Sequence, residues 1–158
     1  MNTIFFKETQ RFNVWWIWLI LLVCAFFSFQ PLLKAIQSNE GISSDQIIGL
    51  IVLGLVILLF MLFRLDTKIQ EEGIYVQFFP FHLNKKFHSW DSISHVEVVE
   101  YSPLKDFGGW GLRWGIKGKC YTVKGNSGIY IHFADGKKLL IGTQKPEEVK
   151  RILEIKNR

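Results

Sequence analysis

The sequence predicts an α-helical membrane hairpin followed by an all-β domain, a small antiparallel barrel or sandwich of about seven strands, which a C-terminal α-helix caps. Two uncharged apolar segments, 12–33 and 47–63, carry the first part of this prediction, and regularly spaced turn residues between short apolar runs carry the second. A bilayer core about 30 Å thick needs roughly 20 apolar helical residues, so each segment is long enough to span it. A chain of 158 residues has room for one such hairpin and one compact domain.

We therefore divide the chain into an N-terminal tail at 1–11, a transmembrane hairpin at 12–63 and a β domain at 64–158. A cleaved signal is not expected, because the first apolar run is long and ends in Phe29-Gln30-Pro31 without a small-x-small pattern. Pro31 is expected to kink or end the first helix. The tail alternates apolar and polar residues, which fits either an interfacial helical turn or a strand at the edge of the β domain.

The charges that flank the apolar segments predict the topology. Basic residues lie on both outer sides of the hairpin, at Lys7, Arg11, Arg64 and Lys68. The connecting loop at 34–46 balances Lys34 with Glu40 and Asp45. The positive-inside rule then places both termini of this integral membrane protein in the cytoplasm.

Local signals mark the ends of the two predicted spans. Trp15, Trp16 and Trp18 gather at the start of the first span, where indole rings favour the headgroup region, and we interpret them as membrane-interface anchors. One residue among Ser43, Ser44 and Asp45 is expected to cap the second helix. No ionisable residue lies within either span, which argues against a proton or ion pathway.

Strand signals fill the β domain. Predicted strands follow one another at Arg64–Gln70, Ile74–Phe79, His82–Ser89, Ile93–Tyr101, Leu112–Lys117, Cys120–Val123, Gly128–Phe133 and Lys138–Ile141. The Asp135-Gly136 pair predicts a tight turn between the last two. The period then changes to that of a helix at 146–156, which begins with Pro146 and carries Val149, Ile152 and Leu153 on one face.

This order of elements resembles a pleckstrin-homology-like (PH-like) domain of the kind found on small bacterial membrane proteins with two N-terminal spans. The resemblance rests on four stretches, at 71–75 (Glu-Glu-Gly-Ile-Tyr), 90–93 (Trp-Asp-Ser-Ile), 128–136 (Gly-Ile-Tyr-Ile to Asp-Gly) and 141–148 (Ile-Gly-Thr-Gln-Lys-Pro-Glu-Glu). It implies a PH-like barrel or sandwich with a capping helix, a location in a bacterial cytoplasmic membrane, and a lipid-binding, peptide-binding or structural role. The sequence shows no dense basic pocket of the phosphoinositide-binding kind, so that ligand is not expected.

The most unusual stretch, 102–119, is rich in glycine, tryptophan and basic residues. Gly109, Gly111 and Gly115 give G-x-G-x-x-x-G, which does not match the spacing of a dinucleotide-type phosphate loop. One reading is a structural hairpin whose glycines supply positive φ and whose tryptophans cover the open end of the barrel. The other is a surface for lipid headgroups or a partner. The candidate contact residues are Lys105, Trp110, Arg113, Trp114, Lys117 and Lys119.

No catalytic, cofactor or metal site is predicted. His82, His88, His95 and His132 follow no metal-ligand spacing. Glu97 and Glu100 point to opposite faces of one predicted strand and make a poor acid–base pair. Cys24 and Cys120 are expected to be free thiols. The net charge of +5 is spread among acids, so nucleic-acid binding is not expected either.

Three functional hypotheses follow. The first is a membrane-anchored cytoplasmic binding or scaffolding module without catalytic activity, whose partners are membrane lipids or another membrane protein. The second is an accessory subunit of a larger transporter or channel complex. The third, the least favoured, is an enzyme that acts on a membrane substrate. The oligomeric state and the identity of the ligand do not follow from the sequence.

Overall fold

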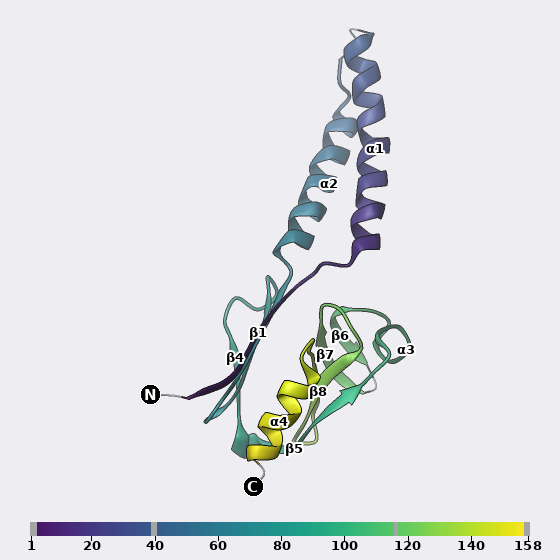
Figure 1. Ribbon diagram of the computed structural model, residues 1–158. Helices are drawn as coiled ribbons and strands as arrows, with labels where there is room; N and C mark the ends of the chain where they lie inside the picture. The colour runs from purple at the N-terminus through teal and green to yellow at the C-terminus, as the bar shows by residue number, and fades with distance from the viewer. Residues whose placement is uncertain (1–2, 39–40, 116, 157–158) are drawn as a thin grey trace. The chain divides into compact units, whose positions relative to one another are not determined.

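The computed structural model describes residues 3–38, 41–115 and 117–156. They form two compact units: residues 13–62 make a helical unit, and the residues up to 12 join those from 63 onward in a β unit. Figure 1 shows the elements of each unit in chain order. The helical unit is thus an insertion between two segments of one β unit.

The helical unit consists of α1 (Trp15–Gln37) and α2 (Ser44–Leu62), which pack against each other. Both helices are long and apolar enough to cross a membrane, as the two apolar segments predict. α1 begins and ends later than the predicted segment 12–33, and Pro31 lies inside the helix without ending it. α2 begins and ends earlier than the predicted segment 47–63. Asn39 and Glu40 of the connecting loop lie outside the described residues.

A reciprocal pair of hydrogen bonds opens α2. The Gln46 N–H donates to the Ser43 hydroxyl oxygen at 3.4 Å, and the Ser43 N–H donates to the Gln46 side-chain oxygen at 3.1 Å. This is a capping box, which satisfies backbone donors that the first helical turn leaves without partners. Among the three candidate caps, Ser43 therefore provides the hydroxyl.

The tail before α1 is a strand. β1 (Ile4–Arg11) pairs antiparallel with β2 (Arg64–Gln70), which follows α2 and matches a predicted strand. The Phe12 N–H donates to the Phe63 carbonyl oxygen at 3.2 Å and closes the end of the pair. Of the two alternatives that the tail's alternation left open, the structure therefore has the edge strand.

β1 and β2 belong to a four-stranded sheet, sheet A, with the order β1-β2-β3-β4. β3 spans Gly73–Phe79 and β4 spans Lys86–Ser89, with antiparallel pairing throughout. The predicted strand at 82–89 is too long at its start. There the His82 N–H donates to the Phe78 carbonyl oxygen at 2.8 Å, which makes a turn after β3.

Five further strands form sheet B, with the order β5-β8-β9-β7-β6. They are β5 (Ile93–Glu100), β6 (Gly111–Gly115), β7 (Gly118–Thr122), β8 (Ser127–Phe133) and β9 (Lys138–Gly142). A short 3₁₀ turn at Trp90–Ser92 joins β4 to β5. β7 and β9 pair in parallel, and the other pairs in this sheet are antiparallel.

The predicted all-β unit is confirmed, but its count of about seven strands and its wholly antiparallel pairing are wrong. The described residues form nine strands in two separate sheets, and one pair is parallel. The reason is the tight turn at 134–137, which folds β9 back onto β8 and brings its other edge against β7. Ile116, which falls within the predicted strand Leu112–Lys117, lies outside the described residues.

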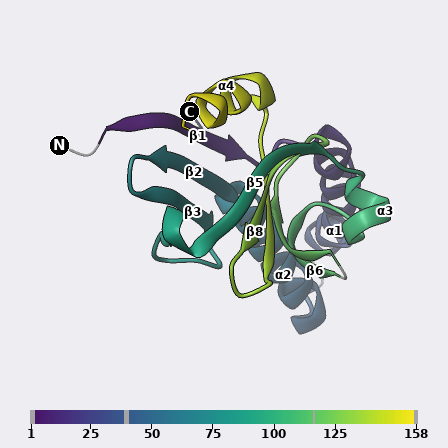
Figure 2. The same cartoon turned by 90° about the horizontal axis from the view of Figure 1, so that it is seen from below.

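Two helices cover parts of the β unit (Figure 2). α4 (Pro146–Lys156) contacts β1, β5 and β8 and buries Val149 and Leu153, so the predicted C-terminal helix is confirmed. α3 (Pro103–Phe107) was not predicted and ends at Gly108, whose φ of 71° is left-handed. α3 packs beside β6.

The inner faces of the two sheets form the core. Fully buried apolar side chains come from both, at Leu65, Ile69, Ile74, Val76, Phe78, Ile129, Ile131 and Ile141. A smaller cluster on the outer face of sheet B joins Phe107 of α3 to Tyr101, Cys120 and Leu140. Phe107 thus covers this face of sheet B, and the segment 102–119, expected as one long hairpin, is a helical turn followed by the β6–β7 hairpin.

Candidate ligand pocket

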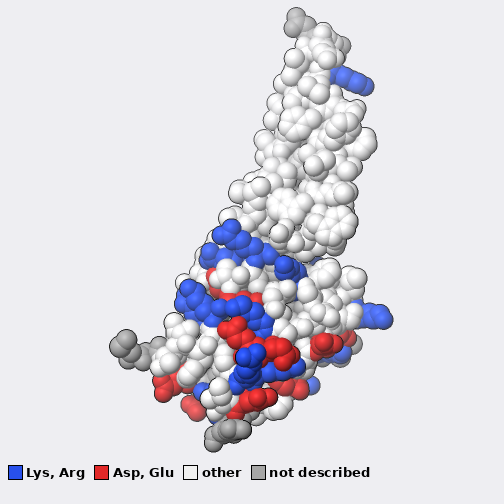
Figure 3. Space-filling view, viewed as in Figure 1, with Lys and Arg blue, Asp and Glu red and all other residues white. Residues whose placement is uncertain are grey.

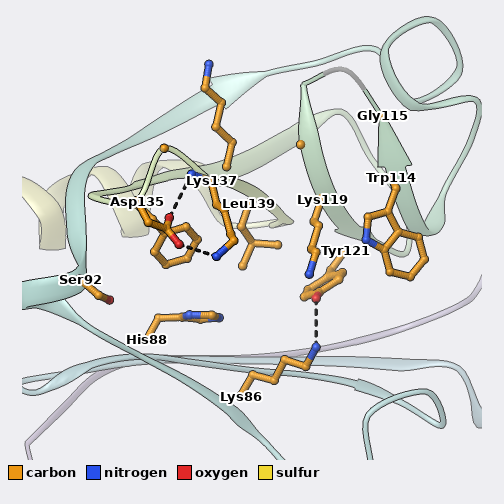
Figure 4. A pocket seen from close by; sticks show the side chains of 14 residues that line it. Lys86, His88, Ser92, Trp114, Gly115, Lys119, Tyr121, Asp135, Lys137 and Leu139 are labelled. Carbon is orange, nitrogen blue, oxygen red and sulfur yellow. Dashed lines mark hydrogen bonds and ion pairs between the residues drawn. The ribbon is translucent and has the colours of Figure 1, made fainter.

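A cavity of about 580 Å³ opens between the two sheets of the β unit. β4, the edge strand of sheet A, lines it from one side, and β6, β7 and the β8–β9 turn line it from the other (Figure 4). Contacts across the space hold the sheets face to face: the ring centroids of Phe78 and Tyr121 lie 6.4 Å apart, and those of His88 and Phe133 lie 5.0 Å apart. We call this cavity the inter-sheet pocket.

The strand register of sheet A turns two polar side chains into the pocket. Lys86 is paired with Val76, and His88 is paired with Ile74. Paired residues on neighbouring strands share a face, and both apolar partners are fully buried in the core. Lys86 and His88 therefore point inward from β4, as Figure 4 shows.

Sheet B contributes the facing wall. Trp114 of β6 is paired with Lys119 of β7, and Lys119 is paired in turn with Leu139 of β9. These three side chains share the inner face with Tyr121, so a cation lies among aromatic and aliphatic groups. Trp114 is 66% exposed, which leaves its indole ring accessible at the pocket opening.

Positive charge dominates the pocket. Four lysines line it, Lys86, Lys119, Lys137 and Lys138, against one carboxylate, that of Asp135. Asp135 is already ion-paired with Lys137. Among the residues that the structure describes, Lys86, Lys119 and Lys138 form no ion pair with an acid.

The Lys86 ammonium instead lies against Tyr121. Its Nζ is 3.5 Å from the Tyr121 hydroxyl oxygen and 5.8 Å from the ring centroid. A cation above a ring is attracted by the electron-rich face, but this contact leaves the positive charge uncompensated. The charge therefore remains available to an anionic ligand.

The histidines near the pocket respond to this positive field. Burial lowers the pKa of His88 below 6.5, and the charges of Lys86 and then Lys119 lower it further. The pKa of His82 is lowered by the same three causes in the same order. Both rings are therefore neutral at pH 7. His88 Nε2 is buried and has no hydrogen-bond partner among the described residues, which leaves one polar atom of the pocket without a bond.

Only two of the six candidate contact residues predicted in the segment 102–119 line this pocket, Trp114 and Lys119. The others are engaged or lie elsewhere. Lys117 forms a 2.6 Å ion pair with Asp106, and the Trp110 indole N–H donates to the Gly125 carbonyl oxygen at 3.0 Å.

The two remaining candidates also lie outside the pocket. Arg113 Nε donates to the Trp110 carbonyl oxygen at 3.3 Å, and Lys105 lies exposed on α3. Trp15, Trp16 and Trp18 begin α1, where Trp15 and Trp16 are exposed.

Sequence reasoning missed Lys86, His88, Lys137 and Lys138, which come from a different strand and turn. The alternation Lys86-Phe87-His88 carries a usable signal, because it places the two polar side chains on one face. That face becomes the inner one only through the pairing of β4 with β3. The four lysines come from three separate places in the sequence, at Lys86, Lys119 and the adjacent pair Lys137 and Lys138, so they form no long basic run.

His95, His132 and Cys120 lie outside the inter-sheet pocket. His95 and His132 come together on β5 and β8, with ring centroids 5.8 Å apart and Glu97 beside both. The described residues hold no group of three or more His, Cys, Asp or Glu side chains placed to bind a metal. Burial raises the pKa of the Cys120 thiol to about 12, so this thiol stays protonated and unreactive.

No protein-family model, curated protein or solved structure matches the chain. The chain is characterised by two long apolar helices, two β-sheets and a C-terminal helix, with a cation-rich pocket between the sheets.

Proposed function

We propose that this protein is a membrane-anchored binding module whose β unit holds an anionic ligand with an apolar part at the cytoplasmic surface of a bacterial membrane. The observation that carries the proposal is the inter-sheet pocket, in which four lysines face one carboxylate around aromatic and aliphatic walls. The proposal includes the PH-like fold that the sequence resemblance implies for the β unit.

The surface of the helical unit supports the membrane anchor. α2 has no buried residue, and α1 buries only Leu21 and Ala35. Helices that are apolar all round and expose this surface in water would aggregate, whereas a bilayer solvates it. In Figure 3 the hairpin surface is almost free of charged groups, whereas basic and acidic groups are interspersed over the β unit.

The pairing of β1 with β2 supports an even number of crossings. The last residue of β1, Arg11, is paired with the first residue of β2, Arg64. The chain therefore leaves and re-enters the β unit at the same end of one sheet. Two spans return the chain to the side from which it left, and the positive-inside rule assigns that side to the cytoplasm.

The size and lining of the pocket support a ligand with two parts. About 580 Å³ lies within the range of small-molecule sites, roughly 300–1,000 Å³. The lysines would meet the charge of the ligand, whereas Trp114, Tyr121 and Leu139 would cover its apolar part. A phosphate or carboxylate on an acyl or aryl group has this chemistry, and membrane lipids are one source of it.

The hydrogen bonds of the pocket favour binding over catalysis. Ser92, His88 and Asp135 all line it, but the Ser92 hydroxyl donates to the Ser89 carbonyl oxygen at 2.6 Å and Asp135 pairs with Lys137. Nucleophilic catalysis needs a hydroxyl linked to a base, and within the described part of the pocket these three groups are not linked.

Phenyl phosphate tests the pocket, because it joins a dianion to an apolar ring and stays in water. The full-length chain, reconstituted in phosphatidylcholine nanodiscs, is titrated by calorimetry with phenyl phosphate and with inorganic phosphate. We expect phenyl phosphate to bind more tightly. Replacing Lys86 and Lys119 together with Gln should weaken it roughly 30-fold, at about 1 kcal/mol for each charge.

A matched variant controls for net charge. Lys124→Gln with Lys150→Gln removes two exposed lysines outside the pocket and should change the affinity less than twofold. Equal affinities in both double variants would refute the pocket as the binding site. Extraction with alkaline carbonate tests the membrane anchor separately. We expect the chain to stay in the membrane fraction, and its release would contradict a membrane-spanning hairpin.

A further inference from the structure

A second cluster of lysines lies on the outer face of sheet A, away from the inter-sheet pocket. Lys7 of β1 is paired directly with Lys68 of β2, and Lys85 immediately precedes β4. The three line one hollow of about 420 Å³ together with Glu8, Thr9, Arg64, Asp66 and Gln77. We call Lys7, Lys68 and Lys85 the lysine triad.

The triad combines like charges where sheets normally avoid them. Two lysines directly opposite each other on neighbouring strands repel and destabilise the pair. The ammonium of Lys85 lowers the pKa of Lys68 below its usual value, and partial burial and then Lys7 lower it further. All three side chains line the same hollow, where Lys68 experiences the positive charge of the other two.

Neighbouring acids do not neutralise the triad. The Asp66 carboxylate accepts a hydrogen bond from the Thr9 hydroxyl at 2.6 Å and lies 2.9 Å from Arg64 Nε. Its attraction is the weakest influence on the pKa of Lys68. In the described part of the chain, none of the three lysines forms an ion pair with an acid.

The other acid that lines the hollow, Glu8, is engaged by the end of sheet B. Glu8 is only 7% exposed, because it lies on the inner side of β1. Its two carboxylate oxygens accept hydrogen bonds from the Thr143 hydroxyl at 2.6 Å and from the Gln144 N–H at 2.8 Å. Glu8 thus fastens β1 to the end of β9 and leaves Lys7 without a counter-charge.

We propose that the lysine triad is a second binding site, specific for a phosphate monoester dianion, which sits between the three ammonium groups. A phosphate monoester carries nearly two negative charges at pH 7 and presents several oxygens to separate donors. Lysines act on phosphate as point charges, and three of them at one point suit a compact dianion. A lipid headgroup and a soluble phosphate ester share this chemistry.

Inorganic phosphate is the first probe. The full-length chain in phosphatidylcholine nanodiscs is titrated by calorimetry, with the unfolding midpoint of the β unit measured in parallel. Lys68→Gln should weaken phosphate binding on the order of tenfold and leave the midpoint unchanged or higher, because it removes a repulsion. Lys7→Gln on the neighbouring strand should give the same pair of effects.

Two controls separate this site from the pocket. Lys124→Gln, an exposed lysine outside both sites, should change nothing, and the pocket variant with Lys86→Gln and Lys119→Gln should retain triad binding of phosphate. Phosphate binding at the lysine triad can therefore be observed even if phenyl phosphate does not bind in the inter-sheet pocket. Binding in the pocket can likewise be observed if the triad binds no phosphate.

Nanodiscs that contain phosphatidic acid distinguish the two sources. If the lipid headgroup occupies the triad, inorganic phosphate binding is lost in the wild-type chain, and the ³¹P signal of phosphatidic acid broadens with wild type but not with Lys68→Gln. If binding of inorganic phosphate persists unchanged, a soluble ester is the ligand. Equal behaviour of wild type and Lys68→Gln toward both probes would overturn the site, as would a loss of binding explained by a lowered unfolding midpoint.

Discussion

The two faces of sheet A present positive charge in opposite ways. Lys85 and Lys86 are neighbours in sequence, but alternation along an extended chain sends their side chains to opposite faces. On the inner face, Lys86 lies against the Tyr121 ring, and other lysines surround an apolar wall. On the outer face, Lys85 lines one hollow together with Lys68 and Lys7.

Under the two proposals, the arrangement of the charges, more than their number, distinguishes the ligands. Lysines spread around rings leave room for a ligand with an apolar body, whereas three lysines around one hollow suit a compact dianion. The ratio of phenyl phosphate affinity to inorganic phosphate affinity should therefore be high at the inter-sheet pocket and close to one at the lysine triad.

Gly118→Ala has the largest expected effect, and it should damage the inter-sheet pocket while it leaves the lysine triad intact. A Cβ at Gly118 would lie 2.5 Å from the Lys138 carbonyl oxygen, and the backbone φ there is +102°. We expect a loss of about 3 kcal/mol in unfolding free energy, measured by urea denaturation, because strain and a backbone clash combine. Because the clash separates β7 from β9, which both line the inter-sheet pocket, phenyl phosphate binding there should be lost. Phosphate binding at the lysine triad should persist.

Gly136→Ala is the matched control for this change. Gly136 also has a positive φ, +82°, but its added Cβ would have no atom within 4 Å. Only the left-handed backbone is penalised, by about 1 kcal/mol. If the two variants lose similar amounts of unfolding free energy, the close approach of Gly118 to Lys138 does not contribute to the destabilisation.

Acid pH should sharpen the comparison with an effect of intermediate size. The folded pKa of His88 lies below its unfolded value of 6.5, so its neutral form stabilises the fold above pH 6.5. That contribution is lost as the pH falls through the lower folded pKa, and His82 acts in the same direction. Urea denaturation should show that the free energy of unfolding decreases as the pH is lowered from about 7 to about 5, a range that brackets the ordinary histidine pKa.

Ligand binding should reverse the shift at His88. An anion in the pocket offsets the charges of Lys86 and Lys119, so the pKa of His88 should rise on addition of phenyl phosphate, as followed by NMR of its ring protons. Phosphate at the lysine triad should not move it. His88→Gln should remove part of the acid sensitivity, and an unaltered pH profile in that variant would contradict the assignment.

The smallest effect is expected for Lys105→Gln. The sequence marks Lys105 as a contact candidate, but the structure places it on α3, which packs beside β6 and outside both cation clusters. Surface substitutions of this kind change stability by less than about 0.5 kcal/mol. Calorimetry should find changes of less than twofold for phenyl phosphate and for inorganic phosphate, and a larger loss would reinstate α3 as part of a ligand site.

Local chemistry made several elements predictable from the sequence. The charge-free length of 12–33 and 47–63 indicates two helices, because that pattern is a property of each segment alone. Pro146 followed by acids and by apolar residues at helical spacing likewise indicates α4. The short helix α3 was not predicted, because five residues are too few to show a helical period of apolar residues.

The candidate sites were less predictable, because each depends on which strands become neighbours. The sequence by itself determined the two apolar helices, most of the strands and the closing helix, since hydrophobic period and turn residues act over a few positions. The tertiary structure alone decided that β1 pairs with β2 across the helical insertion and that β9 lies between β8 and β7. Pairing between distant segments sets Lys7 opposite Lys68 and turns Lys86 toward Lys119 (Figure 4). The register of such pairs is selected when the apolar faces of several strands are buried in one shared core, which no single segment specifies alone.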